Sequence, residues 1–169
     1  MITVRQEKPD DGAAIRHVNE EAFGRPEEAN LVDALRESGA LTVSLVAVSD
    51  GVVVGHIAFS PVSLEPGTVA VRAVGLGPMA MLPTHQRQGI GLQLVQAGLD
   101  ACCEAGYEFV VVLGHPDYYP RCGFVPAKTH GLDCEFEVPE DAFMVKVLRE
   151  DASAELSGRV GYHPAFNSV

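Results

Sequence analysis

The first third of the chain changes from one hydrophobic period to another. Residues 2–7 alternate apolar and polar side chains, as a half-buried strand does. Residues 9–11 supply a turn and a helix N-cap, and apolar side chains then recur at helical spacing over 14–22. A second helical stripe over 31–35 stops at Gly39. This pattern predicts one strand followed by two short helices.

The next segments have the period and composition of strands. Residues 41–48 and 52–60 are rich in β-branched side chains and flank the turn sequence 49–51, which predicts a hairpin. A loop containing Pro and Gly follows at 61–67, and the apolar run 69–81 predicts a further strand.

One residue interrupts that run. Pro78 cannot donate a ladder hydrogen bond, so it predicts a bulge or an unpaired edge in the strand. Residues 87–105 then carry the longest helical pattern, which stops at Gly106. The fully apolar run 109–113 predicts a strand buried on both faces, near the centre of a sheet.

The last part of the chain gives weaker signals. Residues 116–122 allow a short helix, and 134–138 and 142–148 are candidate strands. With 169 residues, 47% of them hydrophobic, we expect one domain at residues 1–150. We expect residues 151–169 to be a C-terminal extension packed on that domain, in which the aromatic side chains fill space.

Composition narrows the class of partner. A net charge of −11 without a basic stripe argues against nucleic acid as a partner, and it would attract cationic amines or simply keep the protein soluble. No apolar run is long enough to span a membrane, and the charged N-terminal segment is unlike a signal peptide, so we expect a cytoplasmic protein. The four cysteines lack CxxC spacing, so we expect reduced thiols and no metal.

The segment 86–91, Gln-Arg-Gln-Gly-Ile-Gly, stands between a predicted strand and the long helix. Glycines at a helix entrance let the backbone approach a ligand, and the free N–H groups there favour phosphate. The pair could also serve only a tight turn. Leu94 occupies the third glycine position of a dinucleotide fingerprint, and a Walker loop is absent. An unrelated pyrophosphate or nucleotide binder is therefore the weaker alternative.

These residues resemble the CoA loop of the GNAT superfamily of N-acetyltransferases, with matches at Gln86, Gly89 and Gly91. The resemblance extends to 76–83, which is similar to the family's bulged strand, and to 118–124, which is similar to its aromatic-to-Gly-Phe element. The amino-acid sequence of these segments is especially similar to the YhbS-like branch of the superfamily. The resemblance implies an α/β fold with a mixed, mostly antiparallel sheet, splayed at the CoA site and flanked by helices.

The resemblance also implies acetyl transfer from acetyl-CoA to an amine by direct attack in a ternary complex. The acceptor would be a small-molecule or peptide amine, and a homodimer is one assembly that it allows. A non-catalytic acyl-CoA sensor or interaction module is the alternative. The residues implied in cofactor binding are Met79, Ala80, Met81, Gln86, Arg87, Gln88, Gly89, Ile90, Gly91, Tyr118 and Phe124.

Catalytic roles follow from the same resemblance. Tyr119 occupies the position of the tyrosine that protonates the leaving thiolate, and Tyr118 is its structural alternative. The general base stays open among Glu21, His56 and His115, each of which also suits a structural or solvated role. We expect the predicted helix pair to form one wall of the acceptor groove, where its carboxylates would suit a cationic amine.

One departure from the family pattern affects the cofactor contacts. Many members carry an asparagine after the strand that corresponds to 109–113, whereas this chain has Gly114, His115, Pro116 and Asp117.

Overall fold

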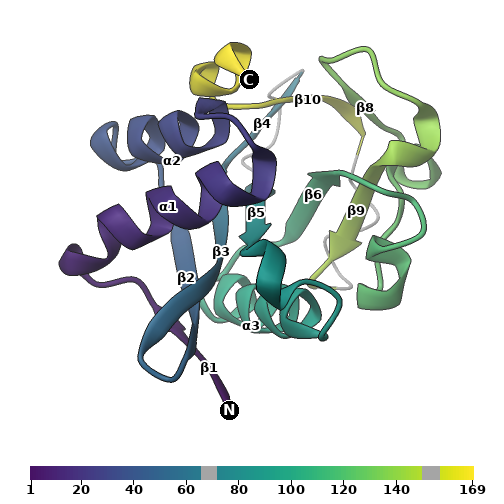
Figure 1. The fold of residues 1–169 in the computed structure, drawn as a ribbon. Helices are drawn as coiled ribbons and strands as arrows, with labels where there is room; N and C mark the ends of the chain where they lie inside the picture. The colour runs from purple at the N-terminus through teal and green to yellow at the C-terminus, as the bar shows by residue number, and fades with distance from the viewer. Residues whose placement is uncertain (66–71, 150–156) are drawn as a thin grey trace.

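The chain forms one large sheet with helices on both faces and a second, small sheet (Figure 1). The computed structural model describes residues 1–65, 72–149 and 157–169. The large sheet contains, in spatial order, β1 (Ile2–Gln6), β2 (Val43–Ser49), β3 (Val52–Pro61), β5 (Ala73–Met81), β6 (Phe109–Leu113), β9 (Phe143–Val147) and β7 (Val125–Pro126). The small sheet contains β4 (Ser63–Glu65), β10 (Gly158–Gly161) and β8 (Leu132–Cys134).

The large sheet is mixed and mostly antiparallel, as predicted. Its β5 and β6 pair in parallel, and its other neighbouring strands pair antiparallel. The helices are α1 (Gly12–Phe23), α2 (Glu27–Glu37) and α3 (Ile90–Glu104). Short 3₁₀ helices span Pro9–Asp11, Pro83–His85, Tyr119–Cys122, Ala127–His130, Glu140–Ala142 and Pro164–Ser168. In the three described ranges, no helix has the length and apolar character to cross a membrane.

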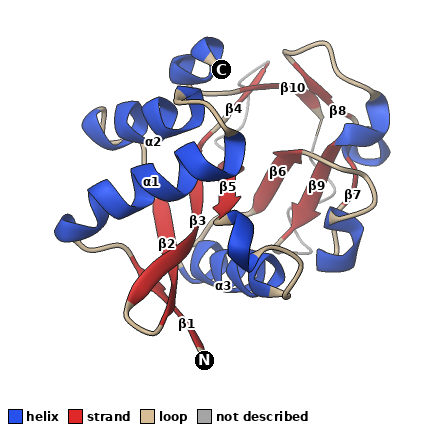
Figure 2. Cartoon of the chain, in the orientation of Figure 1, coloured by secondary structure: helices blue, strands red, loops and turns tan. Residues whose placement is uncertain are grey.

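The two faces of the large sheet have separate cores. Leu94, Val95 and Leu99 of α3 pack on one face, while Ile15 of α1 and Val32 of α2 pack with Val46 on the other. Figure 2 shows the helices on either side of the strands. The strand β6 is buried on both faces, which confirms its predicted central place.

The predicted N-terminal elements are confirmed, with one correction. β1, the two helices and the β2–β3 hairpin form as expected, and the hairpin turn uses positive φ at Asp50 and Gly51. The predicted helix cap is wrong in detail, because the Asp11 carboxylate makes no capping bond to α1. It accepts hydrogen bonds from the Lys8 amide at 2.6 Å and from Arg5, which closes the preceding 3₁₀ turn.

The strand β5 contains the predicted bulge. Ile57 of β3 pairs with Met79 and Phe59 pairs with Leu76, so an extra residue stands on β5 around Pro78. The pairing of β5 with β6 runs from Ala73 to Leu76 only. The edge of β5 that faces β6 is therefore free of ladder bonds over 77–81, and the sheet splays there.

The structure corrects several boundaries in the remainder of the chain. The strand predicted at 134–138 is wrong, because β8 ends at Cys134, where a turn forms as the Phe136 amide donates to the Cys134 sulfur. The loop predicted at 61–67 contains β4, whose Leu64 pairs with Val160 of β10. Residues 69–71 of the predicted strand lie outside the described residues.

The long helix begins later than its periodicity predicts. It starts at Ile90 instead of residue 87, because Arg87 and Gly89 have positive φ values of 64° and 79°. The short β7 had no signal in the sequence, since two residues, one of them proline, carry no period. Residues 151–169 were expected to pack on the domain formed by residues 1–150. Residues 151–156 of that segment lie outside the described residues.

Candidate active site

A cavity of about 780 Å³ lies between the free end of β5 and the start of α3. Its lining includes residues 79–81 of β5, which lie beyond the end of the β5–β6 pairing at Leu76. The side chains around it come from α1, β5, the loop before α3 and the segment after β6. It is lined by Ala22, Phe23, Met79, Ala80, Met81, His85, Gln86, Arg87, Gly89, Gly91, Leu92, His115, Tyr118, Tyr119 and Arg121.

The loop before α3 is held in an open conformation. The side chain of Gln86 donates a hydrogen bond to the Met81 carbonyl at 3.2 Å, which ties the loop to the end of β5. Gly89, the N-cap residue of α3, is left-handed, and a Cβ built on it would meet no atom within 4 Å. Gly89 and Gly91, at the start of the 15-residue α3, both line the cavity, and the first amides of a helix lack intrahelical partners, an arrangement that suits an anion.

The end of β5 supplies the opposite wall. Met79, Ala80 and Met81 all line the cavity. Their backbone groups on the side of β6 make no ladder bonds, because β6 pairing ends at Leu76. This edge can therefore hydrogen-bond an extended ligand that lies between the two strands.

Two adjacent tyrosines occupy different places in the site. The Tyr118 hydroxyl lies directly over Gly91 of α3, where an added Cβ would collide with it. The ring of Tyr119 lies on the backbone of Gly114 and packs edge-on against Phe124, with centroids 5.6 Å apart. Burial raises the pKa of both phenols, so both remain protonated at neutral pH.

The position of Tyr119 restricts the residue that can follow β6 at Gly114. Its ring fills the space that a side chain at Gly114 would need. An asparagine at that position is therefore incompatible with this placement of Tyr119.

A second cavity, of about 370 Å³, lies on the α2 side of the same splay. Four residues line both cavities, namely Phe23, Met79, His115 and Tyr119. The buried Tyr119, only 8% exposed, thus stands where the two cavities meet. One ligand can approach from the side of α3 and another from the side of α2.

The structure gathers most of the predicted site residues, though not all of them. Gln88, Ile90 and Phe124 do not line the main cavity: Gln88 donates to the Thr84 carbonyl, and the other two are buried in the core. Of the three base candidates, His115 lies at the junction, whereas Glu21 is exposed and lines neither cavity.

Several lining residues were missed by the sequence analysis. Ala22 had been counted only as a helix position, His85 and Leu92 had no motif of their own, and Arg121 had no role within the block 118–124. The one available signal was proximity, because each of the last three lies within three residues of a motif position. Phe23 of the helix pair, expected in a wall of the acceptor groove, lines both cavities.

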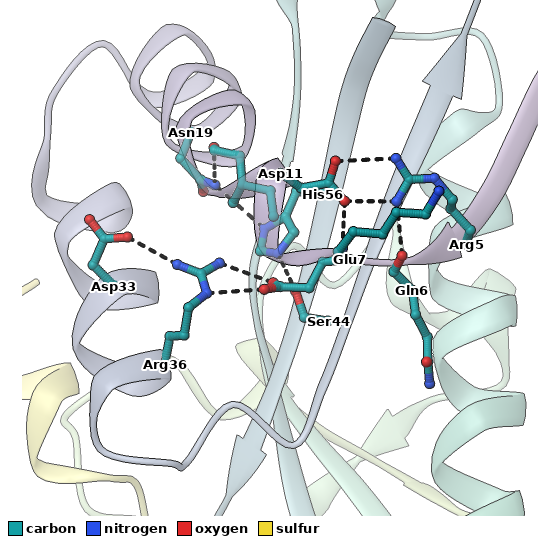
Figure 3. Close-up of polar contacts among 11 residues, drawn as sticks. Arg5, Gln6, Glu7, Asp11, Asn19, Asp33, Arg36, Ser44 and His56 are labelled. Carbon is teal, nitrogen blue, oxygen red and sulfur yellow. Dashed lines mark hydrogen bonds and ion pairs between the residues drawn. The ribbon is translucent and has the colours of Figure 1, made fainter. Parts of the chain in front are cut away.

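His56, the third base candidate, belongs to the polar cluster drawn in Figure 3 and lines neither of these cavities. Three other members of the cluster, Glu7, Arg36 and Ser44, line a separate cavity of about 300 Å³. The His56 side chain is fully buried between α1 and β2. The Nε2 atom lies 2.8 Å from the Ser44 hydroxyl, and the Nδ1 atom lies 3.5 Å from the Asn19 amide nitrogen. Ser44 in turn donates to the Glu7 carboxylate, which also accepts two hydrogen bonds from Arg36.

This chain of bonds fixes the tautomer of His56. The carboxylate of Glu7 only accepts, so the single hydroxyl hydrogen of Ser44 goes to Glu7. The Ser44 oxygen must then accept from His56, which places the imidazole proton on Nε2. Burial lowers the pKa of His56 to about 4, so the ring is neutral at pH 7. Burial alone would raise the pKa of Glu7, but hydrogen bonds from Arg36 and Ser44 outweigh it and lower that pKa.

Comparisons with known proteins place this geometry in one family. A family model described as the acetyltransferase (GNAT) family matches residues 12–124. The uncharacterized N-acetyltransferase YhbS of Escherichia coli K12 is 42% identical over 167 residues, covering 98% of this chain and 99% of that protein. The uncharacterized N-acetyltransferase YjhQ of the same strain is 37% identical over 134 residues, covering 78% and 74%.

Solved structures agree. The crystal structure of E. coli YhbS in complex with CoA superposes with a TM-score of 0.93 at 41% identity, covering 98% of this chain and 92% of that one. A GNAT family acetyltransferase from Brucella melitensis in complex with acetyl-CoA gives a TM-score of 0.82 at 39% identity, covering 98% of both chains.

Proposed function

The chain belongs to the GNAT family of acetyltransferases, and from that premise we propose that its two joined cavities transfer an acetyl group from acetyl-CoA to an amine. The observation that carries the proposal is the meeting of both cavities at Tyr119. Relatives crystallised with CoA and acetyl-CoA support the choice of donor. The direct reaction needs donor and acceptor to meet at one point, and the junction supplies it.

The cavity on the side of α3 is the proposed site of acetyl-CoA. The amides at the start of α3, with Gly89 and Gly91, would hold the pyrophosphate. The free edge of β5 at residues 79–81 would hydrogen-bond the pantetheine arm and polarise the thioester carbonyl. Arg87 and Arg121 line the same cavity and would add positive charge near the phosphates.

Tyr119 is the proposed general acid. In the reaction the amine nitrogen bonds to the thioester carbon, the carbon–sulfur bond breaks, and the sulfur leaves as a thiolate. The phenol of Tyr119 is protonated at neutral pH and lies at the junction, so it can give its proton to that sulfur. The ring is held by Gly114 on one side and Phe124 on the other.

His115 is the proposed acceptor of the proton that the amine loses. It is the one base candidate of the three that lines both cavities, and it is exposed, so it can pass the proton to water. His56 is unsuited to this role because its ring is enclosed by Asn19 and Ser44. Glu21 projects from α1 outside both cavities.

The proposal is tested by thermal melts and by release of CoA. We expect saturating acetyl-CoA to raise the Tm by several degrees, because it binds the folded state, and ATP or NADH at the same concentration to do so far less. We also expect free CoA to accumulate with an amine library and not without it. Equal shifts for all three nucleotides would contradict the donor assignment, and binding without turnover would favour a non-catalytic sensor.

A further inference from the structure

The cavity on the α2 side has an aromatic and aliphatic lining. Phe23 and Leu31 contribute from the helix pair, Leu113 from β6, and Tyr162 and Phe166 from the C-terminal segment. Phe23, at the rim of both cavities, is 40% exposed. A large apolar side chain that remains exposed at a concave surface is typical of a ligand site.

The charges beside this cavity are already paired. The lining carboxylate is that of Glu28, and both of its oxygens accept hydrogen bonds from Arg25, at 3.0 and 2.5 Å. Glu27 is also within 3.4 Å of Arg25, and Glu20 is within 3.6 Å of Arg16. Glu28, the carboxylate side chain that lines the cavity, is thus paired with Arg25, whereas the exposed Glu21 lies outside both cavities. Apart from the chain terminus at Val169, the residues that line the cavity therefore offer a second ammonium group no unpaired carboxylate.

Tyr162 and Phe166 form what we call the aromatic wall of this cavity, and both lie outside residues 12–124, the segment matched by the family model. The ring of Tyr162 lies so close to Gly75 of β5 that an added Cβ would stand 2.8 Å from it. Its centroid is 5.1 Å from that of Phe166 and 5.8 Å from that of Phe136. The Tyr162 hydroxyl is buried and finds no hydrogen-bond partner within 1–65, 72–149 and 157–169, so this wall offers an unpaired hydroxyl in addition to aromatic contact.

From this geometry we propose that the acceptor is a primary amine carried on a short apolar, aromatic-bearing chain, which Phe23, Tyr162 and Phe166 select. The inference rests on the proposed acetyl transfer. The aromatic group lies in the α2-side cavity, and the amine points to the junction at Tyr119 and His115. Phe166 is a specificity-determining residue, because its ring faces the cavity without taking part in the chemistry.

Two amines test the inference with the full-length protein and acetyl-CoA. 2-Phenylethylamine carries an aromatic ring, whereas 1,4-diaminobutane carries a second ammonium on a chain of similar length. We expect kcat/KM to be at least about 10-fold higher for 2-phenylethylamine, mainly through a lower KM.

A matched pair of variants assigns the effect to the cavity wall. Phe166→Ala is expected to raise the KM for 2-phenylethylamine about 10-fold and to leave kcat and the Kd of acetyl-CoA unchanged. Phe136→Ala removes a ring from the same aromatic cluster, but Phe136 does not line the cavity, so the KM should stay within about 2-fold. Thermal melts of both variants show whether each remains folded.

Each outcome bears on a different claim. A higher kcat/KM for 1,4-diaminobutane, or no turnover of 2-phenylethylamine while acetyl-CoA still raises the Tm, overturns the acceptor class and leaves the donor assignment standing. Equal rises in KM for Phe166→Ala and Phe136→Ala show that the wall acts only through stability, and this also overturns the inference. If acetyl-CoA does not bind at all, the proposed function fails, and the acceptor inference fails with it.

Discussion

The facing residues Ala80 of β5 and His56 of β3 belong to two regions with opposite designs. Around Ala80 the sheet is splayed, the backbone edge lacks ladder bonds, and the cavity walls are mostly apolar. Around His56 the side chains are polar, and the imidazole is enclosed by Asn19 and Ser44. The residue types familiar from catalysis, a Glu–Ser–His row, thus lie in the region where the imidazole is fully buried.

The contrast shows that access decides which of the two regions can react. The ring of His56 is fully buried and lines none of the three cavities described here, so its hydrogen bonds can hold α1 and the hairpin together but the ring cannot reach a substrate. The splayed region instead presents the phenol of Tyr119 and unpaired amides to a cavity. Variants of the two regions should therefore separate catalysis from stability.

The largest expected effect is that of Tyr119→Phe. The change deletes one hydroxyl and keeps the ring on Gly114, so the fold and the Kd of acetyl-CoA should barely change. Loss of a general acid should lower single-turnover acetyl transfer by roughly 10²–10⁴-fold.

Tyr118→Phe is the matched control, because the Tyr118 hydroxyl lies over Gly91 and its ring does not line the α2-side cavity. A larger loss of rate in Tyr118→Phe than in Tyr119→Phe would reverse the assignment of the acid.

The second effect concerns the pH dependence of stability. His56 has a pKa of about 4 in the folded protein and about 6.5 in the unfolded chain. Between these pH values His56 is protonated in the unfolded chain but not in the native state. The free energy of unfolding therefore falls as the pH falls from 6.5 to 4. The loss is about 3 kcal/mol at 1.36 kcal/mol per pKa unit. Urea unfolding at several pH values should show this slope, and His56→Gln should flatten it.

The exposed His17 of α1 provides the control for that slope. His17→Gln should retain the full loss of stability between pH 6.5 and 4. If His56→Gln also retains it, the ring is not neutral in the native cluster. Acetyl transfer at pH 8 should be similar in His56→Gln and the parent protein, provided that both are folded.

The smallest of the three effects is that of Gly91→Ala. Its Cβ would displace the Tyr118 hydroxyl and crowd the start of α3, so we expect the Kd of acetyl-CoA to rise about 10-fold in calorimetry. Stability should not fall, because alanine is the better helix former. Gly12→Ala, at the first position of α1 with no atom near its added Cβ, should leave that Kd unchanged.

The sequence predicted the elements in which a hydrophobic pattern continues over many residues. The hairpin, α3 and β6 carry long or fully apolar patterns, and Pro78 predicted the bulge because its missing N–H is a local property. The small sheet escaped prediction because each of its strands has only three or four residues, too few to show alternation. Their pairing joins β10 to β8, about 26 residues away, and to β4, about 95 residues away, a relation that no local pattern records.

The sequence predicted the part of the site in which the backbone conformation or a close contact requires a particular residue type. Glycines at 89 and 91 mark the loop because a side chain there would be strained or would collide. The separation of His115 from His56 and Glu21 could not be predicted, since it depends on which side chains the fold leaves open. The aromatic wall at Tyr162 was likewise assigned only to packing, because its neighbours come from distant strands.

The strand β10 lies between β4 and β8 in the small sheet, although it is the last strand in chain order among the described elements. It pairs antiparallel with residues 63–65 and parallel with residues 132–134. During synthesis, therefore, the donor loop and Tyr119 leave the ribosome well before the aromatic wall that follows β10. The pairing raises the contact order, and its long loop closures make this sheet a slow step in folding. The wall that we propose for the acceptor is thus the last part of the site to be synthesised.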